Sequence, residues 1–325
     1  MESLFRISVY NFKINNLIGN NINKRYSYEY PNIYHTPAPL SKGEFSNSEF
    51  TFERDYNSLG FSDIEWDTAK NNNIRILCLG DSFTEGDGTT SDSSYVYILS
   101  KKLKIKFKNI EVMNAGNCGS DPFFNFKNYE DKLIQFNPDI IIQEYTQYDL
   151  YDILLRGGNE RFINDSTVHY KNSTKFEKIY ALSYTYRIIV NTVGSFIIAN
   201  NKNNLNAGKI KTIDLFKRFN ELSTKNNTEL VCFTFPYTNN FVDNINYDFH
   251  QEMESSFSKF GLKFYNLQPC YEDEIKRTHS NPQDYYWKID GHHNAKGYEM
   301  MAKCLEEIVT PIIEKRLENQ NSLVN

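Results

Sequence analysis

From residue 74 onward, short apolar segments alternate with segments of helical character, and this alternation limits the possible folds more than any other feature of the chain. Helices are expected at 93–104, 122–136, 212–226, 245–260 and 295–317. Because parallel strands need long, usually helical connections, this order predicts an α/β fold with a flavodoxin-like, doubly wound, five-stranded parallel sheet. Its strands are expected at five segments with the composition of strands buried on both faces, namely Ile74–Leu79, Asn109–Met113, Asp139–Glu144, Glu229–Phe235 and Leu262–Leu267.

Two regions fall outside this alternation. Residues 1–73 contain several prolines and many aromatic residues without a helical period, which predicts an irregular, partly β-structured N-terminal extension. Residues 150–211 form a helical insertion that is much longer than a usual α/β connection, and at the carboxyl end of a strand we expect such an insertion to form a lid or substrate platform. One α/β domain is therefore predicted at 74–317, followed by a C-terminal tail at 318–325.

Charge and composition argue against several partners. The formal net charge of the 325 residues is only -5, so no basic field is expected to attract nucleic acid or anionic lipid. The longest apolar stretch, 188–199, is interrupted by polar residues and is too short for a transmembrane segment. The N-terminus lacks the apolar core of a secretory signal, so a cytoplasmic protein is expected. The cysteines are odd in number without CxxC spacing, which favours reduced, mostly buried thiols at Cys78, Cys118, Cys232, Cys270 and Cys304.

The sharpest chemical signal is the segment IRILCLGDSFTEGDG at residues 74–88. A buried strand there leads directly into Gly80, Asp81 and Ser82, so the serine is expected at the carboxyl edge of the sheet, where open α/β folds bind ligands. A plain strand-to-helix turn with a capping Asp or Ser would also explain the GDS triplet. The strand, the triplet and the spaced glycines that follow together favour Ser82 as a catalytic nucleophile.

A second signal, DGHHNAKG, supplies Asp290, His292 and His293 just before the last predicted helix. A serine hydroxyl is a weak nucleophile until an imidazole accepts its proton, and that imidazole needs a carboxylate to fix its tautomer. A solvated histidine pair and a metal site are the alternatives, but no further His or Cys stands at ligand spacing. The segment therefore predicts the acid and base of a serine enzyme, with no metal and no cofactor.

These segments resemble, in order, the four sequence blocks of the SGNH/GDSL hydrolase superfamily, and the resemblance covers about residues 74 to 310. GDSFTEG resembles the first block, the glycine-bearing turn NAGNCGSDP the second, and DGHHNAKGY the fourth. The resemblance implies that Ser82 is the nucleophile and that its backbone amide helps to form the oxyanion hole. It also implies that the oxyanion glycine of the second block corresponds to Gly119.

The third block departs from the family's pattern. The family has Gly-x-Asn-Asp there, and its asparagine is a third oxyanion donor, whereas this chain has Thr146, Gln147, Tyr148 and Asp149. The resemblance therefore leaves open which group replaces the asparagine. Tyr148 could donate its hydroxyl, or Gln147 or Asn117 could reach the site. Tyr148 is equally well interpreted as an aromatic residue of the substrate wall.

The two adjacent histidines give two possible bases. The D-x-x-H spacing from Asp290 selects His293, whereas the family's H-x-N-x-x-G pattern, counted back from Asn294 and Gly297, selects His292. Some members of the superfamily, including glycan acetyltransferase relatives, use D-x-H-x-N, which this chain contains. We favour His292 as the base, with the other histidine as a neighbour or substrate contact.

The segment NSLGFSD at 57–63 resembles an Asn-x-x-Gly-Phe-Arg-Asp stretch of bacterial SGNH proteins from surface-glycan loci, with Ser62 in place of the arginine. The resemblance thus implies a serine esterase that hydrolyses an acyl ester, with O-acetyl favoured, on a small-molecule or glycan substrate through an acyl-enzyme. An acyl transferase of surface-polysaccharide biosynthesis is one alternative. A non-catalytic glycan-binding protein is another, favoured by the missing asparagine and disfavoured by the intact Ser, Asp and His.

Overall fold

The structure is a computed structural model with two compact units, one formed by Met1–Ala38 and Gln147–Asp214 and the other by Pro39–Thr146 and Leu215–Asn325. The larger unit contains the sheet and all residues of the predicted triad. The structure describes residues 37–71, 73–156, 158, 185–186, 189, 193, 202–243 and 245–324. Residues 1–36 and most of the predicted insertion at 150–211 therefore lie outside the described residues, and the predicted domain boundaries stay predictions.

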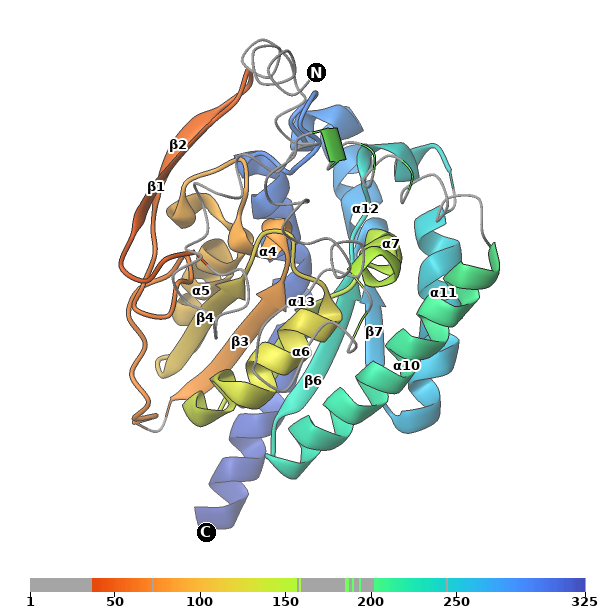
Figure 1. The fold of residues 1–325 in the computed structure, drawn as a ribbon. Helices are drawn as coiled ribbons and strands as arrows, with labels where there is room; N and C mark the ends of the chain where they lie inside the picture. Colours follow the sequence, from red (N-terminus) through yellow and green to blue (C-terminus); the bar gives the residue numbers. More distant parts are fainter. Residues whose placement is uncertain are drawn as a thin grey trace. The chain divides into compact units, whose positions relative to one another are not determined.

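A five-stranded parallel sheet forms the centre of the larger unit (Figure 1). The strand order β4-β3-β5-β6-β7 is that of the flavodoxin-like doubly wound fold, which confirms the predicted fold class. All seven residues of β3 are buried, as expected for a central strand covered on both faces. The strands are β3 (Ile74–Gly80), β4 (Ile110–Gly116), β5 (Ile140–Glu144), β6 (Glu229–Thr234) and β7 (Lys263–Asn266).

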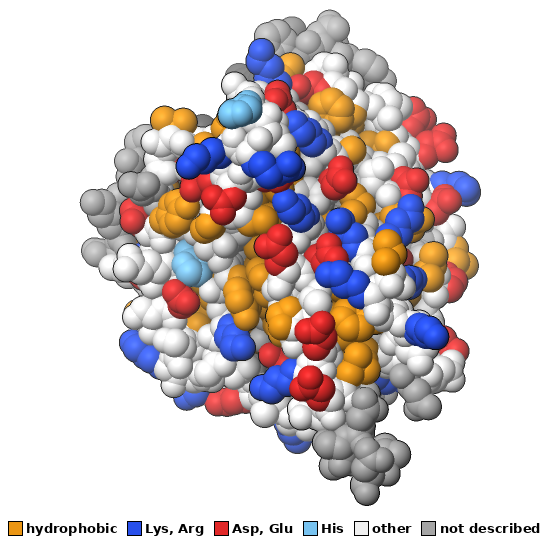
Figure 2. Space-filling model, turned by 180° about the vertical axis from the view of Figure 1, so that it is seen from behind, with side chains coloured by type: hydrophobic (Ala, Val, Ile, Leu, Met, Phe, Trp, Pro, Cys, Tyr) orange, Lys and Arg blue, Asp and Glu red, His pale blue; other side chains and the backbone are white. Residues whose placement is uncertain are grey.

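Helices α5 (Tyr95–Lys106) and α13 (Ala295–Val324) share one hydrophobic core with side chains of the central strands. The other α-helices among the described residues are α4 (Ser82–Glu85), α6 (Pro122–Asp131), α7 (Gln147–Arg156), α10 (Lys202–Lys225), α11 (Ile245–Phe257) and α12 (Gln268–Thr278). The sequence did not predict α12, and α13 continues to Val324, through residues that the sequence assigned to a tail. None of the described helices is long and apolar enough to span a membrane. On the face drawn in Figure 2, basic and acidic side chains are interspersed.

A two-stranded antiparallel hairpin lies outside the main sheet (Figure 1). It consists of β1 (Lys42–Ser46) and β2 (Thr51–Asp55), joined by a turn at residues 47–50. Exposed and buried side chains alternate along β2, and Phe52 and Arg54 are the two that point inward. The Arg54 guanidinium lies over the Phe52 ring, 4.8 Å from its centre, which is a cation–π contact.

The expectation that all cysteines are reduced is wrong for one pair. Cys270 on α12 and Cys304 on α13 form a disulfide between residues 34 positions apart, with Cα atoms separated by 6.0 Å. Packing of two helices, one of them not predicted, brings these cysteines together, and no local spacing pattern in the sequence signals such a pair. Cys78, Cys118 and Cys232 are free thiols, as predicted.

Candidate active site

Ser82 is the first residue of α4, a one-turn helix that follows β3 directly. Asp81 caps this helix, because its carboxylate accepts a hydrogen bond from the Phe83 amide at 2.8 Å. A side chain at Gly80 would collide with Thr84 and Glu144, and Gly86 ends the helix with a φ of 96°, in the left-handed region that favours glycine. This tight strand–turn–helix places Ser82 at the carboxyl edge of the sheet.

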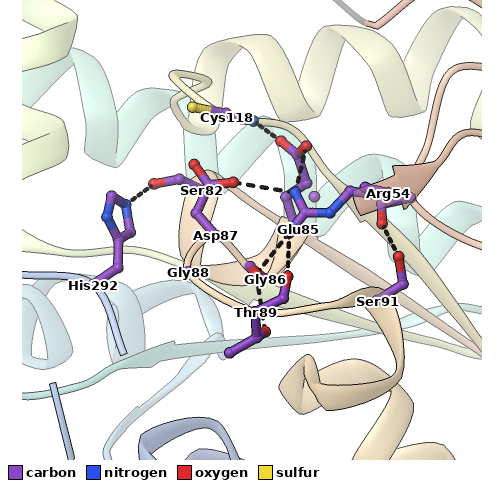
Figure 3. Close-up of polar contacts among 12 residues, drawn as sticks. Arg54, Ser82, Glu85, Gly86, Asp87, Gly88, Thr89, Ser91, Cys118 and His292 are labelled. Carbon is purple, nitrogen blue, oxygen red and sulfur yellow. Dashed lines mark hydrogen bonds and ion pairs between the residues drawn. The ribbon is translucent and has the colours of Figure 1, made fainter. Parts of the chain in front are cut away.

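Three residues of the two sequence signals meet at this edge. The Ser82 hydroxyl lies 2.7 Å from Nε2 of His292, and Nδ1 of the same imidazole lies 2.5 Å from Oδ1 of Asp290 (Figure 3 shows the serine and the histidine). With the Nδ1 proton donated to the carboxylate, Nε2 is the unprotonated nitrogen that can accept the serine proton. The imidazole is 24% exposed and the Asp290 side chain 20% exposed, so the histidine is accessible from the solvent side.

The surrounding charges favour a protonated His292. Burial lowers the pKa of His292, but the hydrogen bond to Asp290 and the negative charges of Asp87, Asp290 and Asp81 outweigh burial and raise this pKa above 6.5. Burial likewise raises the pKa of Asp290, but the hydrogen bond and the charge of His292 outweigh it and bring the pKa below 3.8. The pair is thus suited to hold a proton taken from the serine.

The structure does not bring His293 to the serine. Its side chain is fully buried, and its ring centre lies 4.5 Å from that of Tyr286. Its Nε2 lies 3.1 Å from the Tyr271 hydroxyl. Burial, and then the charge of His292, hold the pKa of His293 well below 6.5, so this imidazole is neutral. A side chain at Gly297 would collide with His293, so the glycine of the sequence motif makes room for this histidine.

A buried arginine holds the loop that follows the nucleophile (Figure 3). Arg54, only 1% exposed, donates to Glu85 Oε1 at 2.8 Å and to Asp87 Oδ1 at 3.1 Å. It also donates to the carbonyl oxygens of Gly86 at 2.7 Å and Thr89 at 3.1 Å. Arg54 was not identified as a site residue from the sequence. It stands two residues after Phe52 and two before Tyr56, so along a strand the three side chains lie on the same face, which indicates that the charge points inward.

The loop after β4, which contains Gly119, is anchored to the nucleophile turn. The backbone amide of Asn117 donates to the Gly80 carbonyl oxygen at 3.1 Å, and the Ser120 hydroxyl donates to the same oxygen at 2.8 Å. The Cys118 amide donates to Glu85 at 2.5 Å. Gly119 has a φ of 75°, a conformation that favours glycine. The position of the predicted oxyanion glycine is therefore fixed relative to β3 and α4.

The remaining predicted donors differ in their surroundings. The Asn117 side chain is 1% exposed, and neither its amide nitrogen nor its amide oxygen has a hydrogen-bond partner in the described parts of the chain. Gln147 and Tyr148 are the first residues of α7 and belong to the smaller unit, so their roles stay predictions.

Over the residues that the structure describes, no three His, Cys, Asp or Glu side chains are grouped as metal ligands.

No protein-family model matches the chain, and no curated protein matches it. Several solved structures are similar to it in fold. An acetylxylan esterase from Geobacillus stearothermophilus has a TM-score of 0.45 and 14% identity, over 71% of this chain and 92% of that one. A member of the lipolytic G-D-S-L family from Veillonella parvula has a TM-score of 0.43 and 14% identity, over 73% and 98%. An α/β hydrolase from the metagenome of Lake Arreo, Spain, has a TM-score of 0.45 and 12% identity, over 73% and 96%.

Proposed function

We propose that this protein is a serine esterase of SGNH type that cleaves an acyl ester, with an O-acetyl group on a carbohydrate as the favoured substrate. The observation that carries the proposal is the continuous chain of contacts from Ser82 Oγ through His292 to Asp290, at 2.7 and 2.5 Å. A serine hydroxyl needs an imidazole within hydrogen-bond reach to become a nucleophile, and that imidazole needs an orienting carboxylate. A glycan-binding protein without catalysis would require neither contact.

In the proposed reaction, Ser82 Oγ attacks the ester carbonyl carbon while its proton passes to His292 Nε2. Asp290 keeps the imidazole in the required tautomer and stabilises its charged form. The backbone amides of Ser82 and Gly119 donate to the developing oxyanion, and each such donor contributes about 3 kcal/mol. The alcohol leaves with the proton from His292. Water then attacks the acyl carbon while His292 accepts its proton, the bond between the acyl carbon and Ser82 Oγ breaks, and Oγ regains the proton as the carboxylic acid leaves.

The carbohydrate part of the proposal rests on the segment at 57–63. This segment forms a tight turn in which Asn57 Oδ1 accepts hydrogen bonds from the amides of Leu59 and Phe61, both at 3.0 Å. The Ser62 hydroxyl lies 2.8 Å from the hydroxyl of Ser91, just after the loop that Arg54 holds. The turn thus contacts the segment that follows the nucleophile, which makes it a candidate for shaping the substrate site.

The test is mass spectrometry of the enzyme during turnover of p-nitrophenyl acetate. We expect a +acetyl peptide that contains Ser82, and loss of both the adduct and the turnover in Ser82→Ala, on the order of 10⁶-fold. Ser93→Ala, which removes a nearby half-exposed serine, is the matched control and should react as wild type. An adduct on another residue, or full turnover in Ser82→Ala, would reject the proposal.

The same assay separates the two histidines and the transfer alternative. His292→Ala should lose turnover to the same extent as Ser82→Ala, whereas a folded His293 variant should retain the acetyl-Ser82 adduct. An added saccharide that accelerates loss of the adduct and becomes acetylated would identify a transferase instead of a hydrolase. If the correctly folded wild-type protein forms no adduct with any acyl ester, the result favours the non-catalytic alternative.

A further inference from the structure

We propose that Asn47 and Glu49, at the turn of the β1–β2 hairpin, are positioning residues that orient Asp290 and, through it, His292; this inference rests on the proposed function. The hairpin lies outside the sheet and precedes the nucleophile in the chain. Asn47 and Glu49 nevertheless contact the loop of the predicted acid, more than 240 positions further along the sequence.

Glu49 binds the backbone just before the acid. Its two carboxylate oxygens each accept a hydrogen bond from the Ile289 amide at 2.9 Å, and Oε2 also accepts one from the Asp290 amide at 2.7 Å. Hydrogen bonds to a charged acceptor are stronger than neutral ones. Because two consecutive amides share one carboxylate, the direction in which the chain enters Asp290 is fixed.

Asn47 binds the side chain of the acid itself. Its Nδ2 donates to Asp290 Oδ2 at 3.2 Å, whereas the other carboxylate oxygen, Oδ1, faces His292. Its Oδ1 accepts from the amides of Glu49 at 2.7 Å and Phe50 at 3.0 Å, which fixes the orientation of the amide. The two oxygens of Asp290 thus have different partners, and the carboxylate cannot rotate away from the imidazole without losing one of them.

The loop needs such external support because little of it is buried. Ile289 is 56% exposed, and a side chain added at Gly291 would meet no atom within 4 Å. The hairpin supplies one apolar contact to the same loop, with the rings of Phe50 and Trp287 centred 5.3 Å apart. The polar contacts of Asn47 and Glu49 are therefore the ones that reach the acid itself.

The two side chains have opposite electrostatic effects on the imidazole. The charged groups around His292 are Asp81 before α4, Asp87 after α4, and Asp290, with the neutral His293 beside it. Glu49 adds a negative charge beside Asp290, so Glu49→Gln should lower the pKa of His292. Asn47→Asp keeps the oxygen that organises the turn, replaces the donor by a negative charge, and should raise this pKa. A screened charge at the surface gives a shift of ~0.3 pH units in each direction.

The experiment measures the pKa of His292 by NMR titration of its imidazole, together with pH profiles of kcat and KM for p-nitrophenyl acetate. We expect kcat to fall about 10-fold in each variant with KM unchanged, because the base is misplaced without loss of a substrate contact. The pKa should move down in Glu49→Gln and up in Asn47→Asp. Glu44→Gln, which removes an exposed carboxylate from β1 of the same hairpin, is the control and should leave both quantities unchanged.

The outcomes separate this inference from the proposed function. If wild type forms the acetyl-Ser82 adduct but the variants match the control in kcat and in the pKa of His292, the inference is overturned and the proposed function stands. A lower thermal midpoint with an unmoved pKa would show a merely structural contact and would also overturn it. If wild type forms no adduct, the proposed function fails, and the NMR shifts alone then decide whether the hairpin orients Asp290.

Discussion

Replacement of Arg54 by leucine should destabilise the fold by about 3–5 kcal/mol, the usual result of breaking a buried ion pair. The guanidinium donates four hydrogen bonds, two to carboxylates and two to backbone carbonyls. Glu85 is 0% exposed, so its charge has no access to water once the cation is removed. Arg54→Lys keeps the charge but not the planar fork, and loss of the two charge-assisted hydrogen bonds to carbonyl oxygens at ~1.5 kcal/mol each predicts a cost of about 3 kcal/mol.

Urea unfolding followed by the fluorescence of the two tryptophans measures these free energies. The decisive comparison is the double variant Arg54→Leu with Glu85→Gln. The single oxygen of an uncharged amide at 85 can accept from the Cys118 backbone amide, and its NH2 group can donate to the Tyr56 hydroxyl, whose proton is free to rotate. These two groups contact Glu85 at 2.5 and 2.9 Å, so the double variant should recover at least ~1 kcal/mol of the loss. If Arg54→Leu costs less than about 1 kcal/mol, or if the second substitution adds a further loss, the ion-pair argument is wrong.

Three further predictions follow from the site and its supports. His292 acts as a base only when neutral, so kcat/KM should fall as the pH decreases through its pKa; because this pKa is raised, the half-maximal point should lie above pH 6.5 in a pH–rate profile. Opening the Cys270–Cys304 bridge with a reductant, or by Cys270→Ser, should cost about 4 kcal/mol from the entropy of the 34-residue loop, and an unchanged melting temperature would contradict this. Asn117→Ala should lower kcat about 10²-fold without loss of stability, because its buried amide is an unused donor; equal turnover would exclude it as an oxyanion donor.

The sheet was predictable because each strand is a local signal. β3 is an apolar run, interrupted only by Arg75, that ends at Gly80, and its position after residue 73 follows from the sequence alone. The end of β4 was less predictable, since its last residues, Asn114, Ala115 and Gly116, have low strand propensity and are extended only because they pair with β3. Helix α12 was missed because its sequence, QPCYEDEIKRT, has only a short apolar face, although a proline in the first turn is compatible with a helix start.

The contacts that support the site could not be predicted in the same way. Asn47 and Glu49 stand in an ordinary polar turn, and nothing near them in the sequence distinguishes their contact with Asp290 from solvent exposure. Their partner is determined by the packing of a hairpin whose two strands pair with each other and, in the described part of the chain, not with the five-stranded sheet. Sequence patterns report on neighbours in the same element, whereas this contact depends on where two separate elements meet.

The two consecutive histidines show how the fold separates roles that the sequence leaves equivalent. His293 forms a β-bridge with Tyr286, and its side chain points into the aromatic core, where burial holds its pKa low. His292 lies in the bend just before this bridge, and its side chain instead points to Ser82 and Asp290. The D-x-x-H count from Asp290 therefore selects the buried imidazole, and the H-x-N-x-x-G count selects the one that contacts the serine. The glycine of that second pattern, Gly297, is required because a side chain there would collide both with the Tyr285 carbonyl oxygen and with the His293 side chain.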